Sequence, residues 1–200
     1  MKWLFVQGRH VMVKVVICNG KPESGKTTVQ DIAKRLCLCD VTARYWFGNV
    51  MPTAVDSCST VDFVKEVATF CGWDGTKTLE NRRFLSNLKD LLTNWGDIPC
   101  KKISERVEGL SKSKNVHWIL FVDCREPAEI EKLKQRFNAT TLLVRRLGDE
   151  IVETSNHADA GVFNYEYDYT IKNYGTLEDL QNEVHCFLEY MKEREFYFGN

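Results

Sequence analysis

One eight-residue motif constrains the fold of this chain more than any other feature. Residues 20–27 read Gly-Lys-Pro-Glu-Ser-Gly-Lys-Thr and match the pattern G-x-x-x-x-G-K-[ST]. The β-branched run Val13–Asn19 comes directly before the motif, and residues 26–38 carry apolar side chains at helical spacing directly after it. A phosphate-binding loop needs a strand before it and a helix after it, so this context favours such a loop over a chance match in a glycine turn.

The rest of the chain alternates between strand-like and helix-like patterns. We expect further strands at 41–47, 116–124, 140–144 and 168–172, and helices at 59–71, 78–95, 97–110 and 127–137, followed by a C-terminal helix capped by Thr176. Such alternation predicts an α/β fold with a mostly parallel sheet. We expect one domain over residues 1–200, with a helical insertion at about 48–115 and a lid-like loop at about 145–165.

Charge, apolar content and cysteine spacing limit the partners of the chain. There are 27 Lys and Arg against 28 Asp and Glu, and this net charge of −1 excludes a strongly basic nucleic-acid binder. The longest apolar runs, such as 118–122, are far shorter than the ~20 residues that cross a bilayer, so no membrane partner is expected. The eight cysteines include no Cys-x-x-Cys pair, so we expect reduced thiols in a cytoplasmic protein.

The motif itself provides most of the expected nucleotide-binding residues. Its glycines let successive backbone N–H groups point inward, and the following helix N-terminus adds positive potential. Lys26 is expected to reach the β- and γ-phosphates of ATP and to take part in catalysis, and Thr27 to ligate Mg²⁺. Glu23 can equally be an outward-pointing loop residue. The expected cofactor-binding residues of the loop are Gly20, Glu23, Ser24, Gly25, Lys26, Thr27 and Thr28.

A carboxylate follows the apolar strand at 116–124. Asp123 stands at the end of that strand, where a phosphoryl-transfer enzyme needs a carboxylate near Mg²⁺ and the γ-phosphate. The alternative is an aspartate that only ends the strand or caps the helix beginning at Pro127. Arg125, two residues later, is expected to point into the same crevice as a catalytic cation.

Two pairs of arginines are candidates for binding phosphate, because each guanidinium can bind phosphate oxygens bidentately. Arg145 and Arg146 end the strand at 140–144 and are expected to be catalytic. Arg82 and Arg83 open the long helix of the insertion. For each pair the alternative is a solvated charged face. The expected acceptor-binding cations of the insertion are Lys65, Lys77, Arg82 and Arg83.

Three segments together resemble the deoxynucleoside monophosphate kinases of bacteriophages and bacteria, within the wider P-loop nucleoside monophosphate kinases. They are GKPESGKT, DCREPAEIEKL and HADAGVFNYEYDYTIKNYGTLEDL, and the likeness spans residues 13–190. The spacing of Asp123, Arg125 and Pro127 and the run Tyr-Asp-Tyr-x-Ile-x-Asn-x-Gly at 167–175 are its more specific features.

The resemblance implies a fold and an activity. It implies a P-loop kinase fold, a three-layer α/β/α sandwich around a five-stranded parallel sheet, with ATP and Mg²⁺ as cofactors. It also implies a nucleoside monophosphate held by the helical insertion. Arg145 and Arg146 map to a mobile phosphate-binding segment, and Asn173 and Gly175 to the turn beside the donor adenine. The segment after Arg146 differs from the long arginine-rich lid of such enzymes.

The expected function is therefore transfer of the γ-phosphoryl group of ATP to a (deoxy)nucleoside monophosphate. One alternative is a P-loop kinase with another acceptor, such as a phosphorylated metabolite, a nucleoside or a coenzyme precursor. Another is a regulatory NTPase that hydrolyses or only binds the nucleotide. The expected partners are ATP and the monophosphate, and homodimerisation is left open.

Overall fold

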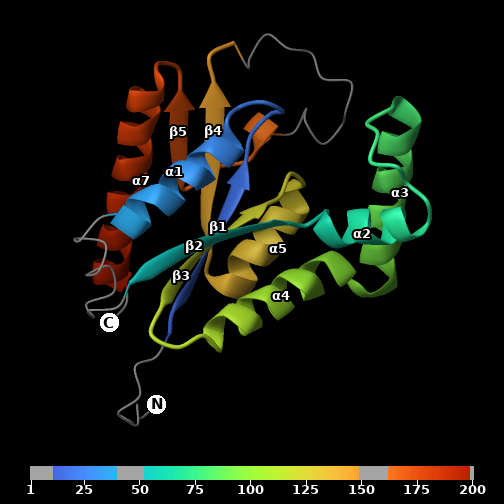
Figure 1. The fold of residues 1–200 in the computed structure, drawn as a ribbon, viewed down its shortest axis with the longest axis horizontal. Coiled ribbons are helices and arrows are strands. Elements are labelled where there is room, and N and C mark those ends of the chain that lie inside the picture. The colour runs from blue at the N-terminus through green and yellow to red at the C-terminus, as the bar shows by residue number, and fades with distance from the viewer. Residues whose placement is uncertain (1–10, 40–51, 149–161, 199–200) are drawn as a thin grey trace.

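A five-stranded parallel sheet forms the centre of the computed structural model, which describes residues 11–39, 52–148 and 162–198 (Figure 1). The strands are β1 (Val13–Asn19), β2 (Thr53–Ser59), β3 (His117–Asp123), β4 (Thr140–Arg146) and β5 (Tyr169–Asn173). Their order across the sheet is β2-β3-β1-β4-β5, and every neighbouring pair is parallel. The carboxyl ends of all five strands therefore lie at one edge of the sheet.

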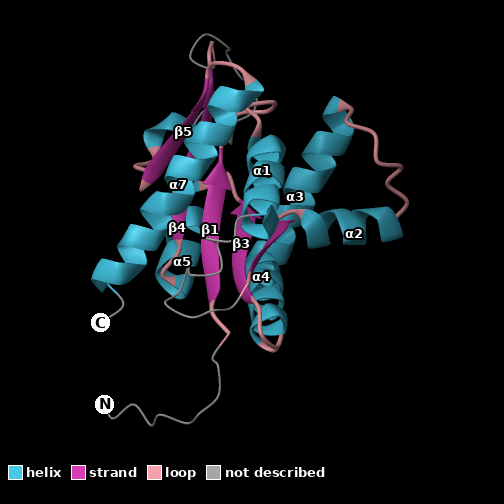
Figure 2. Ribbon diagram, turned by 60° about the vertical axis from the view of Figure 1, so that its left-hand side comes forward, coloured by secondary structure: helices cyan, strands magenta, loops and turns pink. Residues whose placement is uncertain are grey.

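Helices cover both faces of this sheet (Figure 2). On one face, α1 (Lys26–Cys39) and α7 (Leu177–Phe198) pack Ile32 and Phe187 into the same buried cluster as Phe121 of β3. On the other face, α4 (Ile98–Ser111) and α5 (Pro127–Phe137) bury Ile103 and Ile130 with strand side chains that point the opposite way. Because apolar side chains cover both faces, β1 and β3 are nearly continuous hydrophobic runs. The predicted three-layer α/β/α sandwich is confirmed.

The stretch between β2 and β3 contains three helices, α2 (Asp62–Phe70), α3 (Leu79–Gly96) and α4. The expected insertion began at about residue 48, but the structure places strand β2 at Thr53–Ser59, so the helices begin later. In this edge strand only Thr53 and Val55 are buried, and its small polar side chains give little hydrophobic signal. The strand expected at 41–47 lies outside the described residues, as does most of the lid-like loop.

Several helix starts follow capping rules. The Thr78 hydroxyl accepts a hydrogen bond from the Asn81 backbone N–H (3.2 Å) at the start of α3. At the start of α7, the Thr176 hydroxyl accepts from the Asp179 N–H (3.2 Å) while the Asp179 carboxylate accepts from the Thr176 N–H (2.8 Å). These reciprocal bonds satisfy N–H groups that have no partner within the helix. No helix within the described ranges combines the length and apolar character that crossing a membrane requires.

Candidate nucleotide-binding site

The loop between β1 and α1 depends on glycine at both ends of the motif. Gly20 has φ +151°, and a Cβ there would lie 2.4 Å from the backbone oxygen of Val144 at the end of β4. Gly25 has φ +102°, and a Cβ there would lie 2.5 Å from the side-chain nitrogen of Asn173. Any larger residue would push the loop away from β4 and β5. The two glycines therefore let the loop lie close against the carboxyl edge of the sheet.

Asn173 and Gly175, which the resemblance associates with the donor adenine, occupy different positions. The side-chain nitrogen of Asn173 donates to the backbone oxygen of Ser24 (3.0 Å), so the end of β5 holds the loop directly. Gly175 lies instead beside Asp179 at the start of α7. Among the described contacts, Asn173 touches the loop and Gly175 belongs to the cap of a helix.

The loop has a cationic side chain lying over it. The Lys26 ammonium donates to the backbone oxygens of Gly20 (2.7 Å) and Lys21 (2.8 Å). The Ser24 hydroxyl is buried, and within the described residues it has no hydrogen-bond partner. Thr27 and Thr28 are exposed in the first turn of α1. The cradle thus combines an ammonium group, hydroxyl groups and a helix N-terminus, the donor set that phosphate groups require.

Asp123 lies beside the loop at the end of β3, and in the sheet it pairs with Cys18 of β1. Its carboxylate accepts a hydrogen bond from the Gln30 side chain (2.9 Å). Burial raises the pKa of Asp123, and the nearby Lys26 ammonium and the Gln30 hydrogen bond oppose that rise. Gln30 was not among the predicted site residues, although it follows Thr27 by three positions and so shares its face of α1.

Arg145 and Arg146 belong to β4 itself rather than to a segment after it, since the strand continues to Arg146. A guanidinium nitrogen of Arg146 donates to the backbone oxygen of Glu23 in the loop (3.3 Å). The Arg145 guanidinium carbon lies 5.1 Å from the centre of the Phe163 ring. The structure therefore brings Arg146 into contact with the loop, whereas Arg145 lies against the Phe163 ring.

The turn after β3 is tied to the loop through Asn19, which is buried and was not predicted. Its side-chain nitrogen donates to the Tyr167 hydroxyl (2.7 Å) and to the backbone oxygen of Arg125 (3.3 Å). Its side-chain oxygen accepts from the Gly20 N–H (2.8 Å). The Asn19 amide therefore fixes the positions of three segments relative to one another: the loop, the Asp123–Arg125 turn and the segment before β5.

The predicted acceptor-binding cations do not meet the loop. Lys65 pairs with Asp62 of its own helix (3.7 Å), and Lys77, Arg82 and Arg83 are exposed around the start of α3. In the described part of the chain no hydrogen bond or ion pair joins these four side chains to residues 20–27. Figure 1 shows α2 and α3 projecting away from the sheet.

The insertion is held to the sheet layers by ion pairs. Lys89 of α3 pairs with Glu129 of α5 (2.7 Å), and these side chains are only 16% and 11% exposed. Lys132 of α5 pairs with Asp97 between α3 and α4 (2.5 Å). Helix α5, which begins shortly after β3, therefore fixes the C-terminal half of α3.

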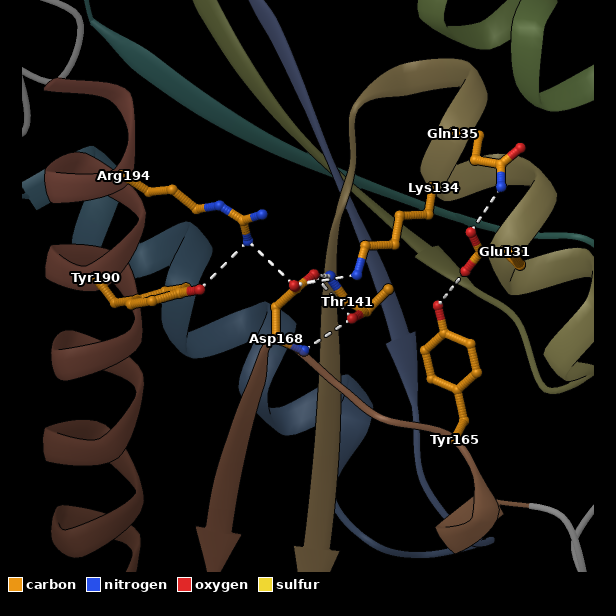
Figure 3. Close-up of polar contacts among 8 residues, drawn as sticks. All are labelled: Glu131, Lys134, Gln135, Thr141, Tyr165, Asp168, Tyr190 and Arg194. Atoms are coloured by element: carbon orange, nitrogen blue, oxygen red, sulfur yellow. Dashed lines mark hydrogen bonds and ion pairs between the residues drawn. The ribbon is translucent and has the colours of Figure 1, made fainter. Parts of the chain in front are cut away.

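A second polar cluster surrounds Asp168, just before β5 (Figure 3). Its carboxylate accepts from the Thr141 N–H (2.8 Å) and hydroxyl (2.9 Å), and pairs with Lys134 (3.1 Å) and Arg194 (3.4 Å). Burial opposes the charge of Asp168, but these hydrogen bonds outweigh it and lower its pKa. A cavity of about 510 Å³ borders the cluster. The Asp168 carboxylate beside it is paired with two cations, which indicates a structural role.

The side chains beside the loop offer few ligands for a metal ion. Among residues 11–39, 52–148 and 162–198, no three or more His, Cys, Asp or Glu side chains are arranged to hold a metal ion. The oxygen donors at the loop include the Thr27 hydroxyl and the Asp123 carboxylate. Such a sparse oxygen set fits Mg²⁺, which keeps several waters and is bound mainly through substrate phosphates.

Comparisons with known proteins find a likeness only in the fold. No family model matches the sequence, and no curated protein matches it significantly. Among solved structures, dephospho-CoA kinase from Campylobacter jejuni is similar at 16% identity and a TM-score of 0.46, over 90% of this chain and 98% of that one. Shikimate kinase from Bacteroides thetaiotaomicron is similar at 14% identity and a TM-score of 0.42, over 91% and 99%. Shikimate kinase from Aquifex aeolicus is similar at 12% identity and a TM-score of 0.41, over 93% and 99%.

Proposed function

We propose that this protein is a P-loop kinase that transfers the γ-phosphoryl group of ATP to a (deoxy)nucleoside monophosphate. The observation that carries the proposal is a convergence at one edge of the sheet. The glycine loop follows β1, Asp123 ends the neighbouring strand β3, and two arginines end β4 on the other side of β1. Ligands of open parallel sheets bind at this edge, and phosphoryl transfer needs this combination of donors and charges.

The residues of the loop would bind and neutralise the phosphate chain. The Lys26 ammonium, which donates to two loop carbonyls, would exchange them for oxygens of the β- and γ-phosphates. The Thr27 hydroxyl and the Asp123 carboxylate would hold Mg²⁺, which supplies further neutralisation of the phosphate charge when bound. Arg145 and Arg146 would face the charge that develops on the transferred group.

This chemistry needs no general base in the protein. The phosphate of a nucleoside monophosphate is already largely ionised at neutral pH, since its second pKa is about 6. Its oxygen can attack the γ-phosphorus once both are aligned, so catalysis consists of positioning and charge neutralisation without a phospho-enzyme intermediate.

The choice of a monophosphate acceptor is supported by the sequence likeness and by the position of the insertion. Helices α2–α4 follow β2 and precede β3, so they begin beside the same carboxyl edge as the loop. We propose that the acceptor lies between this edge and the insertion, whose exposed cations Lys65, Lys77, Arg82 and Arg83 are the candidates to face its phosphate.

The proposal is tested by ADP release from ATP in the presence of a panel of acceptors. The panel contains ribo- and deoxynucleoside monophosphates, the corresponding nucleosides and phosphorylated metabolites, with a sample that lacks any acceptor. We expect turnover with one or a few monophosphates and almost none without acceptor. Turnover with another acceptor class alone would replace the monophosphate, and ADP release without any acceptor would indicate an NTPase.

The Lys26→Ala variant tests the loop in the same assay. We expect at least a 100-fold lower turnover, which corresponds to about 2.7 kcal/mol, because the ammonium that contacts the phosphates is lost. The circular dichroism spectrum should match the wild type, because the hydrogen bonds of the Lys26 ammonium to Gly20 and Lys21 go to carbonyls of the loop rather than to the core. Lys34→Ala, at an exposed position of the same helix, is the matched control. Turnover of Lys26→Ala within threefold of wild type would contradict this role.

A further inference from the structure

The buried face of α1 carries one polar side chain among its described residues. That face consists of Val29, Ile32, Ala33 and Cys37, which are apolar, and of Gln30, which is only 7% exposed. A buried amide costs free energy unless it is hydrogen-bonded, whereas an apolar side chain would pack against the sheet without that cost. Such a departure from an apolar pattern is typical of a functional site.

The Gln30 amide reaches from α1 to the end of β3. Its side-chain nitrogen donates to Oδ1 of Asp123 (2.9 Å). Burial raises the pKa of Asp123, and the Lys26 ammonium is the largest influence that lowers it, so the carboxylate lies beside the glycine loop. Among the described contacts of this carboxylate only Oδ1 accepts a hydrogen bond, and Oδ2 therefore keeps its lone pairs for a further ligand.

The backbone of Asp123 is held independently of its side chain. Its carbonyl oxygen accepts hydrogen bonds from the Thr60 N–H (3.1 Å) and from the Ser59 hydroxyl (3.2 Å) at the end of β2. The end of β3 is thus in place without any contribution from Gln30. What the Gln30 amide determines is the rotation of the Asp123 carboxylate about its side-chain bonds.

The same hydrogen bond connects the two elements that carry the oxygen donors proposed for Mg²⁺. Thr27 precedes Gln30 by three positions on α1, so the two residues lie on adjacent turns of one helix. Asp123 belongs to β3. A contact between Gln30 and Asp123 therefore sets the position of the carboxylate relative to the helix that carries the Thr27 hydroxyl.

We propose that Gln30 is a positioning residue, which holds the Asp123 carboxylate by Oδ1 so that Oδ2 faces the Mg²⁺ ion of the bound nucleotide. The proposal rests on the kinase function and on the role of Asp123 proposed above. Carboxylates that bind metal ions are commonly fixed by hydrogen bonds from neighbouring groups, and loss of such a neighbour costs about 10–100-fold in metal affinity. Gln30 acts through Asp123 and contacts neither the ion nor the phosphates.

The test compares the binding of β,γ-imido-ATP, which is not hydrolysed, in saturating Mg²⁺ and in EDTA. The ratio of the two Kd values, measured by calorimetry, is the gain in affinity that the ion provides, and it requires no turnover. Gln30→Met keeps the length of the side chain but cannot donate, so we expect it to reduce this gain about tenfold. The Kd in EDTA should stay within twofold, whereas a merely structural defect would weaken binding in both conditions.

Three further variants separate orientation of the carboxylate from other effects. Gln30→Asn keeps the amide but is one methylene too short to reach Asp123, so it should reduce the gain as Gln30→Met does. In the Asp123→Asn background, Gln30→Met should add less than twofold, because no charged oxygen remains to be held. Gln135 of α5 donates to Glu131 (2.7 Å) in a similar amide–carboxylate bond outside the site, and Gln135→Met should leave the gain unchanged.

Each outcome bears on one proposal or on both. An undiminished gain in Gln30→Met, or an equal loss in the presence and absence of Asp123, would overturn the role of Gln30, as would a wild-type affinity that does not depend on Mg²⁺. A wild-type protein that shows the gain but transfers no phosphoryl group to any acceptor would overturn only the kinase function, and the binding series would still decide on Gln30. A wild-type protein that does not bind the analogue would overturn both.

Discussion

At Asp123 the fold keeps a carboxylate where burial disfavours its charge. Its pKa is raised mainly by burial, while the Lys26 ammonium and the Gln30 hydrogen bond oppose the rise. A carboxyl group whose pKa is higher in the folded than in the unfolded state costs stability as pH rises above the unfolded pKa, and the cost is complete above the folded pKa. The ionised carboxylate is therefore retained at a cost in stability, which is typical of a residue kept for function.

The Asp123→Asn variant separates the proposed role of the carboxylate in Mg²⁺ binding from its cost in stability. We expect the half-saturating Mg²⁺ concentration of the kinase reaction to rise at least tenfold, about 1.4 kcal/mol, because a charged oxygen is lost. Without nucleotide or Mg²⁺, the thermal midpoint should rise at neutral pH, since the penalised charge is gone. Below the usual carboxyl pKa range the two proteins should unfold alike, because Asp123 is then protonated in both states. An unchanged Mg²⁺ titration would contradict a role of Asp123 in binding the ion and would leave it only a structural role at the end of β3.

At the scale of elements, the Asp168 carboxylate connects the sheet to helices on both of its faces. It accepts two hydrogen bonds from Thr141 of β4 and pairs with Lys134 of α5 and Arg194 of α7 (Figure 3). Its side chain is 17% exposed, so these charge-assisted bonds are partly shielded from water. One residue ahead of β5 therefore connects that strand to both helix layers.

Asp168→Asn should lower the free energy of unfolding by about 1.5–3 kcal/mol at neutral pH, the range for hydrogen bonds to charged groups. Because the pKa of Asp168 is lowered in the fold, its contribution is present above the usual carboxyl pKa and is lost as pH falls through the folded pKa. The difference from wild type should thus shrink in acid, as measured by urea unfolding at several pH values. Glu108→Gln, whose pair with Lys112 is 67% and 71% exposed, should leave the free energy of unfolding almost unchanged because solvent screens the pair. Equal losses in the free energy of unfolding for both variants would contradict this connecting role of Asp168.

The elements that the sequence predicts best are those with a strong local signal. β1 and β3 are nearly continuous apolar runs, and the glycine loop is a contiguous motif, so both could be predicted. β2 could not, because an edge strand of small polar residues carries little hydrophobic pattern. Gln30 was missed because its partner Asp123 lies 93 positions away, and such a contact arises only from the packing of the folded chain. Asn19 was missed for the same reason.

At the scale of the whole molecule, the described cysteines differ in how deeply their side chains are buried. All seven are free thiols, with Cys18, Cys37, Cys100 and Cys124 buried and Cys71 and Cys186 exposed. Burial is the main cause that raises the pKa of Cys100, to about 12, and it raises that of Cys124 as well. Since the thiolate is the reactive form, buried cysteines are protected both by access and by ionisation.

Site-resolved labelling with iodoacetamide measures this division. In the native protein we expect Cys71 and Cys186 to react at least about 100-fold faster than Cys18, Cys100 and Cys124. In denaturant the five rates should converge, which is the internal control. Labelling of Cys18 at the rate of Cys71 in the folded protein would contradict the buried position of β1 at the centre of the sheet.

The order of the strands in the sheet also governs how the chain is made. Among the described strands, β1 is made before its two neighbours, β3 and β4, which begin only at His117 and Thr140. Until β3 is made, this apolar strand lacks both of its neighbours in the described sheet, a situation typical of slow-folding parallel sheets that need protection from aggregation. The glycine loop lies against Val144, so it cannot take its final shape before β4 is synthesised. A nucleotide can consequently stabilise the finished polypeptide but not the first half of the nascent one.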